Sequence, residues 1–460
     1  METSLAPRRL LHLVASFCTR KSLLNSLTTR TRLVMTLLLF SIALVVPAHV
    51  AAEPPNVLLI VSDDHAWTDY GFMGHPSIQT PNIDRLAATG LTFTRGYVPS
   101  SLCCPSLASL ITGRYPHQHR VTSNDPPLPP GMKPQEFYRS AAFEQGRARR
   151  SQHLAAATTL PKLIGESGYR SLQTGKWWQG HFSQGGFTDG MTQGGRHGDD
   201  GLTIGRKTLE PIKTFLDSCN DSKQPFLIWY APMMPHDPHT PPDRLLNKYN
   251  VLTDSIHIAR YWAMIEWFDE TVGNIMDELS QRQLLENTIV VYVADNGWIQ
   301  SQDNARYAPK SKQSPYDGGL RTPIIVNWKG HIEPQISSHL AQSIDIVPTL
   351  RKALQLPADE SLPGIDLLDE KSVARRSTIF GSCFSHNSND LDDPSRSLRW
   401  RWMIDGNTKL IVPNPELEPN GSVELFDLEQ DPFENNNLAD RDSDRLKEMT
   451  KALDSWWTPN

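Results

Sequence analysis

The sequence predicts an α/β protein with a large, mostly parallel sheet between helix layers and a smaller antiparallel subdomain at the C-terminal end. Three observations lead to this prediction. Apolar runs alternate with amphipathic segments from residue 56 onward, as in a sheet covered by helices on both faces. Two of these runs end in acidic residues, where ligands bind in open parallel sheets. After about residue 376 the pattern changes to short strand-like pieces separated by turns.

The elements of the large sheet follow from local patterns. The segment 56–64, NVLLIVSDD, is an almost continuous apolar run, which is typical of a buried parallel strand. Residues 80–90 have helical spacing and stop at Gly90. The later segments repeat the alternation: helix 159–169, strand 170–177, helix 211–219, strand 226–233, helix 258–279 and strand 288–297.

The C-terminal part predicts a small antiparallel sheet followed by a polar final helix. Its expected strands are 377–384, 399–405, 408–413 and 423–428. We therefore divide the mature chain into an α/β domain, 53–375, and a C-terminal subdomain, 376–460. Two less regular stretches, 124–150 and 179–205, are expected to be surface loops, which often rim the pocket in α/β enzymes.

The first 52 residues predict a secretory signal peptide. Scattered Arg and Lys precede the apolar run 33–46, and small residues follow it. This run of about fourteen residues is shorter than the ~20 that a membrane-spanning helix needs. We expect a secreted or periplasmic protein with no stable membrane anchor. The net charge of −6 argues against a nucleic-acid partner.

Oxygen-bearing side chains follow two of the expected strands. Asp63 and Asp64 end one strand, and Asp295 and Asn296 end another. Neighbouring parallel strands would bring all four together, and oxygen-only ligation favours a hard cation, Ca²⁺ or alternatively Mg²⁺. A double Asp by itself is more often a helix cap or a loop, so the paired occurrence carries the prediction.

Adjacent cysteines stand at an expected helix start. Cys103 and Cys104 precede Pro105, and at such a position backbone N–H groups and the helix dipole would lower a thiol pKa. The alternative is that this pair only packs in the core. Vicinal cysteines bridge each other poorly, whereas a Cys219–Cys383 disulfide is compatible with export.

Seven segments of the chain match the motifs of one known family, in the order in which that family has them. CCPSLASLITGRYP resembles the family signature, Cys-x-Pro-Ser-Arg with a Leu-Thr-Gly-Arg-like end. The other six, in chain order, are VSDDHAWTDYGFMGHPSIQTPNIDRLAATGLTF, TGKWW, PHDPHTPP, ADNG, KQSPYDGGLRTP and SIDIVPTL. Together the seven segments give the chain a resemblance to the formylglycine-dependent sulfatases of the alkaline-phosphatase-like superfamily.

The resemblance implies a nucleophile and a metal site. Cys103 would be oxidised to formylglycine by a maturation enzyme, and Cys104 would fill the variable position. The hydrated aldehyde offers one hydroxyl to attack sulfur and a second to expel sulfate. The implied Ca²⁺ ligands are Asp63, Asp64, Asp295 and Asn296, with the converted Cys103 beside them.

The resemblance also implies the residues that handle charge and protons. Lys176 and Lys312 would neutralise the sulfuryl oxygens, and Lys310 is the alternative to Lys312. His236 would protonate the leaving alcohol, with His239 as its alternative. His181 is a further candidate for binding substrate.

Two positions depart from the family pattern. Leu107 stands where the signature has Arg, and Trp178 stands where the lysine segment has His. Neither replacement supplies the lost donors or acceptors. Either other side chains compensate or catalysis has been lost; the candidates for compensation are Arg114, His181 and His197 with Asp199 and Asp200.

We therefore expect an exported, Ca²⁺-dependent sulfatase acting on sulfated carbohydrates or aryl sulfates. Two alternatives stay open. One is a phosphomonoesterase or phosphodiesterase of the same superfamily, which would need a zinc site richer in His or Cys. The other is a non-catalytic module that binds sulfated glycans.

Overall fold

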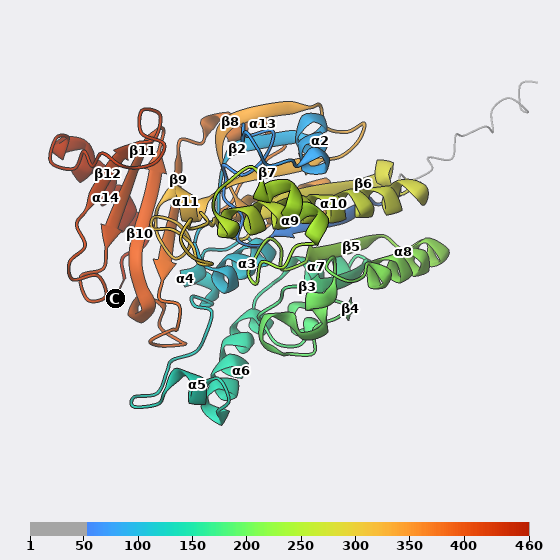
Figure 1. Ribbon diagram of the computed structural model, residues 1–460, viewed down its shortest axis with the longest axis horizontal. Helices are drawn as coiled ribbons and strands as arrows, with labels where there is room; N and C mark the ends of the chain where they lie inside the picture. The colour runs from blue at the N-terminus through green and yellow to red at the C-terminus, as the bar shows by residue number, and fades with distance from the viewer. Residues whose placement is uncertain (1–52, 460) are drawn as a thin grey trace, which may run out of the picture. The chain divides into compact units, whose positions relative to one another are not determined.

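The computed structural model describes residues 53–459, and the expected signal peptide lies outside this range (Figure 1). An eight-stranded sheet forms the centre of the described chain. In order across the sheet the strands are β4 (Asp189–Gly190), β3 (Arg170–Gly175), β5 (Phe226–Ala231), β1 (Asn56–Ser62), β6 (Thr288–Ala294), β7 (Arg321–Asn327), β2 (Leu91–Tyr97) and β8 (Gln335–Gln342). The pairs from β4 to β6 are parallel, β7 runs antiparallel to both neighbours, and β2 pairs with β8 in parallel. The predicted fold class is confirmed.

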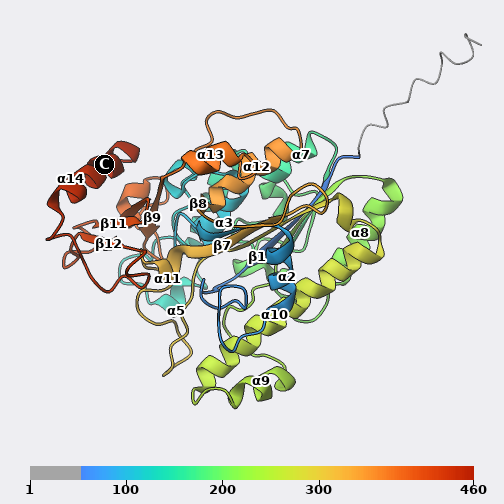
Figure 2. The same cartoon turned by 90° about the horizontal axis from the view of Figure 1, so that it is seen from above.

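Helices cover both faces of the sheet because its central strands are apolar on both sides. In β1, Val57 and Leu59 belong to one core cluster, whereas Leu58 and Ile60 belong to the other. Figure 2 shows the two helix layers on either side of the sheet. One layer contains α2 (Pro81–Thr89), α8 (Glu210–Ser222) and α10 (Ile256–Gln281), with α9 (Asp243–Asn250) packed on α10; the other contains α3 (Cys103–Thr112), α7 (Leu160–Gly165), α12 (Ile346–Ala353) and α13 (Glu370–Arg375).

A second, four-stranded antiparallel sheet forms the C-terminal part, as expected. Its order is β12 (Glu424–Asp427), β11 (Thr408–Pro413), β10 (Leu398–Asp405) and β9 (Thr378–Phe384), and α14 (Ser443–Trp456) packs against it. Buried Lys409 of β11 joins this sheet to the segment before β7, because its Nζ lies 2.8 Å from Asp317 Oδ1 and 2.7 Å from Glu434 Oε1.

The stretch 124–150 is not the loop that the sequence predicted. It contains α5 (Pro134–Phe137) and most of α6 (Ala141–Ala156), and Ser140 caps α6 by accepting the Phe143 N–H. Polar residues on most sides of α6 hid the helical period in the sequence. The other irregular stretch, 179–205, contains short 3₁₀ turns, η1 (Phe182–Gly185) and η2 (Arg196–Thr203), together with β4.

The Cys219–Cys383 disulfide, which the sequence left as a possibility, does not form in residues 53–459. Cys219 lies in α8 and Cys383 in β9, and both are free and buried. Ser101 Oγ lies 3.4 Å from Cys383 Sγ. In residues 53–459 no helix is long and apolar enough to cross a bilayer.

Candidate active site

The four predicted metal ligands meet at the carboxyl ends of β1 and β6. These strands pair with Ser62 opposite Ala294, so the residues that follow them emerge side by side. The Asp64 N–H donates to Asp295 Oδ1 at 3.1 Å, and Asn296 Nδ2 donates to Asp64 Oδ1 at 2.6 Å. All four side chains are buried. The parallel pairing therefore concentrates three carboxyl groups and an amide at one edge of the sheet.

Two buried lysines balance these acids. Lys176, just after β3, has its Nζ 2.5 Å from Asp63 Oδ1 and 3.5 Å from Asp295 Oδ2. Lys312 Nζ lies 2.7 Å from the Asp64 carboxylate. Burial alone would raise the pKa of Asp64, but the Lys312 charge holds that pKa below its ordinary value. Lys310, the alternative to Lys312, instead donates to the Glu434 carbonyl and lies outside the cluster.

The cluster suits a divalent cation. Ligand atoms of Asp63, Asp64, Cys103 and His236 all lie within 4.8 Å of one another. Asp63 Oδ2 and the Asn296 side-chain oxygen are buried with no hydrogen-bond partner in the described chain. Buried acceptors without donors are costly, and a bound cation would satisfy both. Because most of the possible metal-ligand atoms are oxygens, the site favours Ca²⁺ or Mg²⁺.

Helix α3 begins at Cys103 and points this residue into the cluster. Cys104 instead bonds residues outside the cluster: its backbone N–H donates to Asn124 Oδ1 at 2.9 Å, and its Sγ accepts from Gln179 Nε2 at 2.9 Å. The expected lowering of the thiol pKa is wrong. Burial raises the pKa of both thiols, because removing a thiolate from water outweighs the nearby positive charges.

The structure brings His236, and not His239, to the cluster. His236 Nε2 lies 3.5 Å from Asp64 Oδ2, and His236 Nδ1 lies 2.9 Å from Asp237 Oδ1. Burial lowers the pKa of His236, but Asp63 and Asp64 raise it further, and the net change is upward. His239 instead packs against aromatic rings, and burial lowers its pKa to about 4.

The candidates for compensation fall in different places. Arg114 donates to Ser361 and lies 3.5 Å from Asp359, and His181 caps η1, so neither lines the pocket beside the cluster. Asp199 accepts loop N–H groups, and the Asp200 carbonyl accepts from Thr203 Oγ1. Among these candidates, His197 alone lines the pocket.

Positive side chains surround Trp178, one of the two positions that depart from the family pattern. Arg196 lies 4.9 Å from the Trp178 ring and Arg150 lies 5.9 Å from it. Arg196 also forms a two-pronged ion pair with buried Asp125, at 2.9 and 2.8 Å, and donates to His197 Nε2 at 2.9 Å. Leu107, by contrast, is buried in the core cluster beneath the sheet. The guanidinium groups around Trp178 therefore come from α6 and η2, and α3 supplies none.

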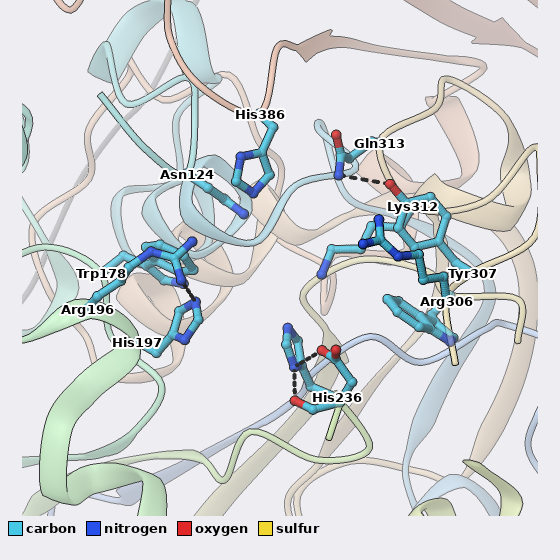
Figure 3. A pocket seen from close by; sticks show the side chains of 12 residues that line it. Asn124, Trp178, Arg196, His197, His236, Arg306, Tyr307, Lys312, Gln313 and His386 are labelled. Carbon is cyan, nitrogen blue, oxygen red and sulfur yellow. Dashed lines mark hydrogen bonds and ion pairs between the residues drawn. The ribbon is translucent and has the colours of Figure 1, made fainter. Parts of the chain in front are cut away.

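A pocket of about 280 Å³ opens beside the cluster, between two walls (Figure 3). Trp178, Arg196 and His197 lie on one side of the view, and Arg306, Tyr307 and Lys312 lie on the other. Sequence reasoning missed most of the lining, and the lining residues that it singled out are Trp178, His197, His236 and Lys312. The missed residues are Asn124, Arg196, Asp237, Trp298, Arg306, Tyr307, Gln313 and His386.

Comparisons with known proteins agree with this geometry. The Sulfatase family model matches residues 55–356. N-acetylgalactosamine-6-sulfatase of Mus musculus is 29% identical over 72% of this chain and 69% of its own length. Arylsulfatase A of Homo sapiens is 27% identical over 87% of each chain, and the ulvan-active sulfatase of Formosa agariphila is 25% identical over 88% of this chain and 80% of its own.

Solved structures show the same fold. The crystal structure of Ps i-CgsB with k-i-k-neocarrahexaose superposes with a TM-score of 0.69 at 22% identity, covering 88% of this chain and 94% of that chain. The phosphonate monoester hydrolase of Agrobacterium radiobacter has a TM-score of 0.63 at 17% identity, with 87% and 95% covered. The family model matches most of this chain, and the structure brings the expected site residues together. The chain therefore belongs to the sulfatase family and is a sulfuric ester hydrolase.

Proposed function

We propose that this chain is an exported sulfatase that cleaves sulfate esters of carbohydrates, with formylglycine made from Cys103 and a bound Ca²⁺. The observation that carries the proposal is the convergence on Cys103 of three acids, one amide, two lysines and His236 at one sheet edge. Asp63, Asp64, Asp295 and Asn296 would hold the cation, which would polarise a sulfate oxygen and orient the nucleophile.

The chain's own side chains divide the remaining work. Lys176, just after β3, and Lys312, from the loop before β7, both reach the cluster and would donate to the sulfuryl oxygens as negative charge develops there. His236 Nδ1 faces Asp237, so Nε2, which lies 3.5 Å from Asp64 Oδ2 on the cluster side, would give a proton to the leaving alcohol. Formylglycine would supply a hydrated aldehyde, with one hydroxyl for attack and one for release of sulfate.

Carbohydrate sulfates suit the pocket better than a flat aromatic ring alone. The wall that contains Trp178 carries Arg196 and His197, and the facing wall carries Tyr307 beside Arg306. Such a mixture of ring faces and polar donors is common in sites for polar ligands. Relatives named N-acetylgalactosamine-6-sulfatase and ulvan-active sulfatase support a glycan substrate. Export rests on the sequence pattern of residues 1–52.

A sulfate-release assay tests the proposal. Purified protein from its own host is incubated with a panel of sulfated sugars and 4-methylumbelliferyl sulfate, and free sulfate is measured. We expect release that chelation abolishes and Ca²⁺ restores. Cys103→Ala should lower the rate by about 10³-fold or more, whereas the neighbouring Cys104→Ala serves as the matched control and should retain most of it.

Each contrary result points to one of the alternatives. Two zinc ions per chain together with phosphate release would favour a phosphoesterase. Binding of sulfated glycans without any sulfate release would favour a non-catalytic module. Equal loss in Cys103→Ala and Cys104→Ala would contradict the assignment of the nucleophile.

A further inference from the structure

Arg306 differs from the other positive residues of the pocket in having no acidic partner. In residues 53–459 its guanidinium forms no ion pair and no hydrogen bond, although it lines the pocket and is exposed. The other strong pairings of the lining join Arg196 to Asp125, Lys312 to Asp64 and His236 to Asp237. Asp237 is the acidic residue that lines the pocket, and it already pairs with His236. An anionic ligand would therefore find Arg306 uncommitted.

The backbone around Arg306 is held firmly. The Arg306 N–H donates to Asn304 Oδ1 at 2.9 Å, and the Arg306 carbonyl accepts from the Ser301 N–H and from Gln300 Nε2, both at 3.0 Å. Gln300 itself accepts from Trp298 Nε1 at 3.0 Å. These hydrogen bonds hold the turn that carries Arg306, and the conformation of the turn does not depend on the Arg306 guanidinium. A side chain on such a support loses less freedom when it binds a ligand.

Arg306 stands at the end of an aromatic wall. The neighbouring Tyr307 packs 5.1 Å from Trp298, and its hydroxyl accepts from Gln313 Nε2 at 2.9 Å. Lys312 Nζ lies 5.4 Å from the Trp298 ring on the cluster side. A sugar ring against this wall would have its sulfate ester at Lys312 and another substituent towards Arg306. The volume of about 280 Å³ exceeds what a sulfate group alone would need.

We propose that Arg306 binds a second anionic group of the substrate, a carboxylate or a further sulfate, on or next to the sugar whose ester is cleaved. The preferred substrates are then polyanionic glycans. Guanidinium is suited to this role because its planar donors bind either anion with two parallel hydrogen bonds. This inference rests on the proposed sulfatase function, and it names the substrate class of the same pocket.

Calorimetry on protein carrying Cys103→Ala, which holds ligands uncleaved, tests the inference. Three probes are compared: N-acetylgalactosamine 6-sulfate, N-acetylgalactosamine 4,6-disulfate, and the disaccharide of a uronic acid with N-acetylgalactosamine 6-sulfate. We expect one or both doubly anionic probes to bind about ten- to hundredfold more tightly than the monosulfate. The probe that gains more identifies the second anion as sulfate or as carboxylate.

Variants at Arg306 decide whether this residue causes the gain. Arg306→Gln should remove it, Arg306→Lys should keep part of it, and the exposed Arg441→Gln, outside the pocket, should leave it intact. The inference is overturned if the probes bind equally, or if Arg306→Gln weakens all three by the same factor. Sulfate release by the wild-type protein is measured separately. If no sulfate is released, the proposed function is wrong, whereas the ratios of probe affinities still test whether Arg306 binds a second anion.

Discussion

The floor of the pocket and its rim are built in different ways. The floor is the ligand cluster around Cys103. Most of its residues directly follow β1, β3 and β6 or begin α3, whereas His236 and Lys312 come from the loops after β5 and before β7; all of them except His236 are buried. The rim, which includes Arg196, His197, Arg306 and His386, comes from turns and loops and is partly exposed. The comparison teaches that the reacting groups are held mainly at strand ends and a helix start, whereas the groups that would contact the rest of the substrate come from turns and loops.

This difference also explains what the sequence could predict. Asp63 and Asp295 were predictable because apolar runs identify neighbouring parallel strands, whose ends must meet. Arg196 and Arg306 were not, because a lone arginine in an irregular stretch has no period and its direction depends on tertiary contacts. Helix α6 was missed for a related reason, since its polar surface gives no apolar stripe. The resemblance to sulfatases supplied roles for Lys312 and His236 that spacing alone could not.

The largest effect is expected at the floor. Lys312→Met should lower kcat for sulfate release by about 10²- to 10³-fold, because a donor to the developing charge is lost. The matched control is Lys310→Met, whose amine bonds the Glu434 carbonyl outside the cluster. Steady-state kinetics on both variants test the contrast. A greater loss from Lys310→Met would reverse the assignment of the two lysines.

A smaller effect is expected at the rim. Arg196→Gln should reduce kcat/KM by about tenfold, since the substrate loses one charged donor and His197 loses its partner. Asp125→Asn should weaken the same wall by releasing Arg196. The two single variants and the double variant are compared kinetically. Losses that simply add would show that Asp125 does not act through Arg196.

The last effect concerns stability, through the support of the floor. His119 is buried beneath α3, where its Nδ1 accepts the Val121 N–H at 3.1 Å and its Nε2 lies 3.0 Å from Ser109 Oγ. Burial lowers the pKa of His119 to about 3. Between pH 6.5 and about 3 the unfolded chain therefore binds a proton that the folded chain does not. Stability should fall with decreasing pH in this window, by about 1.4 kcal/mol per unit from this residue.

Urea unfolding at several pH values measures this contribution. The difference in unfolding free energy between wild type and His119→Gln should shrink as the pH is lowered from 7 to 5, because the variant lacks the proton-binding imidazole. An unchanged difference over this range would show that His119 already takes up a proton in the folded protein.

The central claim is that Cys103 becomes the nucleophile despite Leu107. Mass spectrometry of the peptide spanning Gly96 to Arg114, from protein made in its own host, tests this claim most directly. The account predicts the mass loss that marks conversion of one cysteine to formylglycine, with fragment ions placing it at Cys103 and leaving Cys104 a thiol. Two unmodified thiols in protein that releases no sulfate would contradict it.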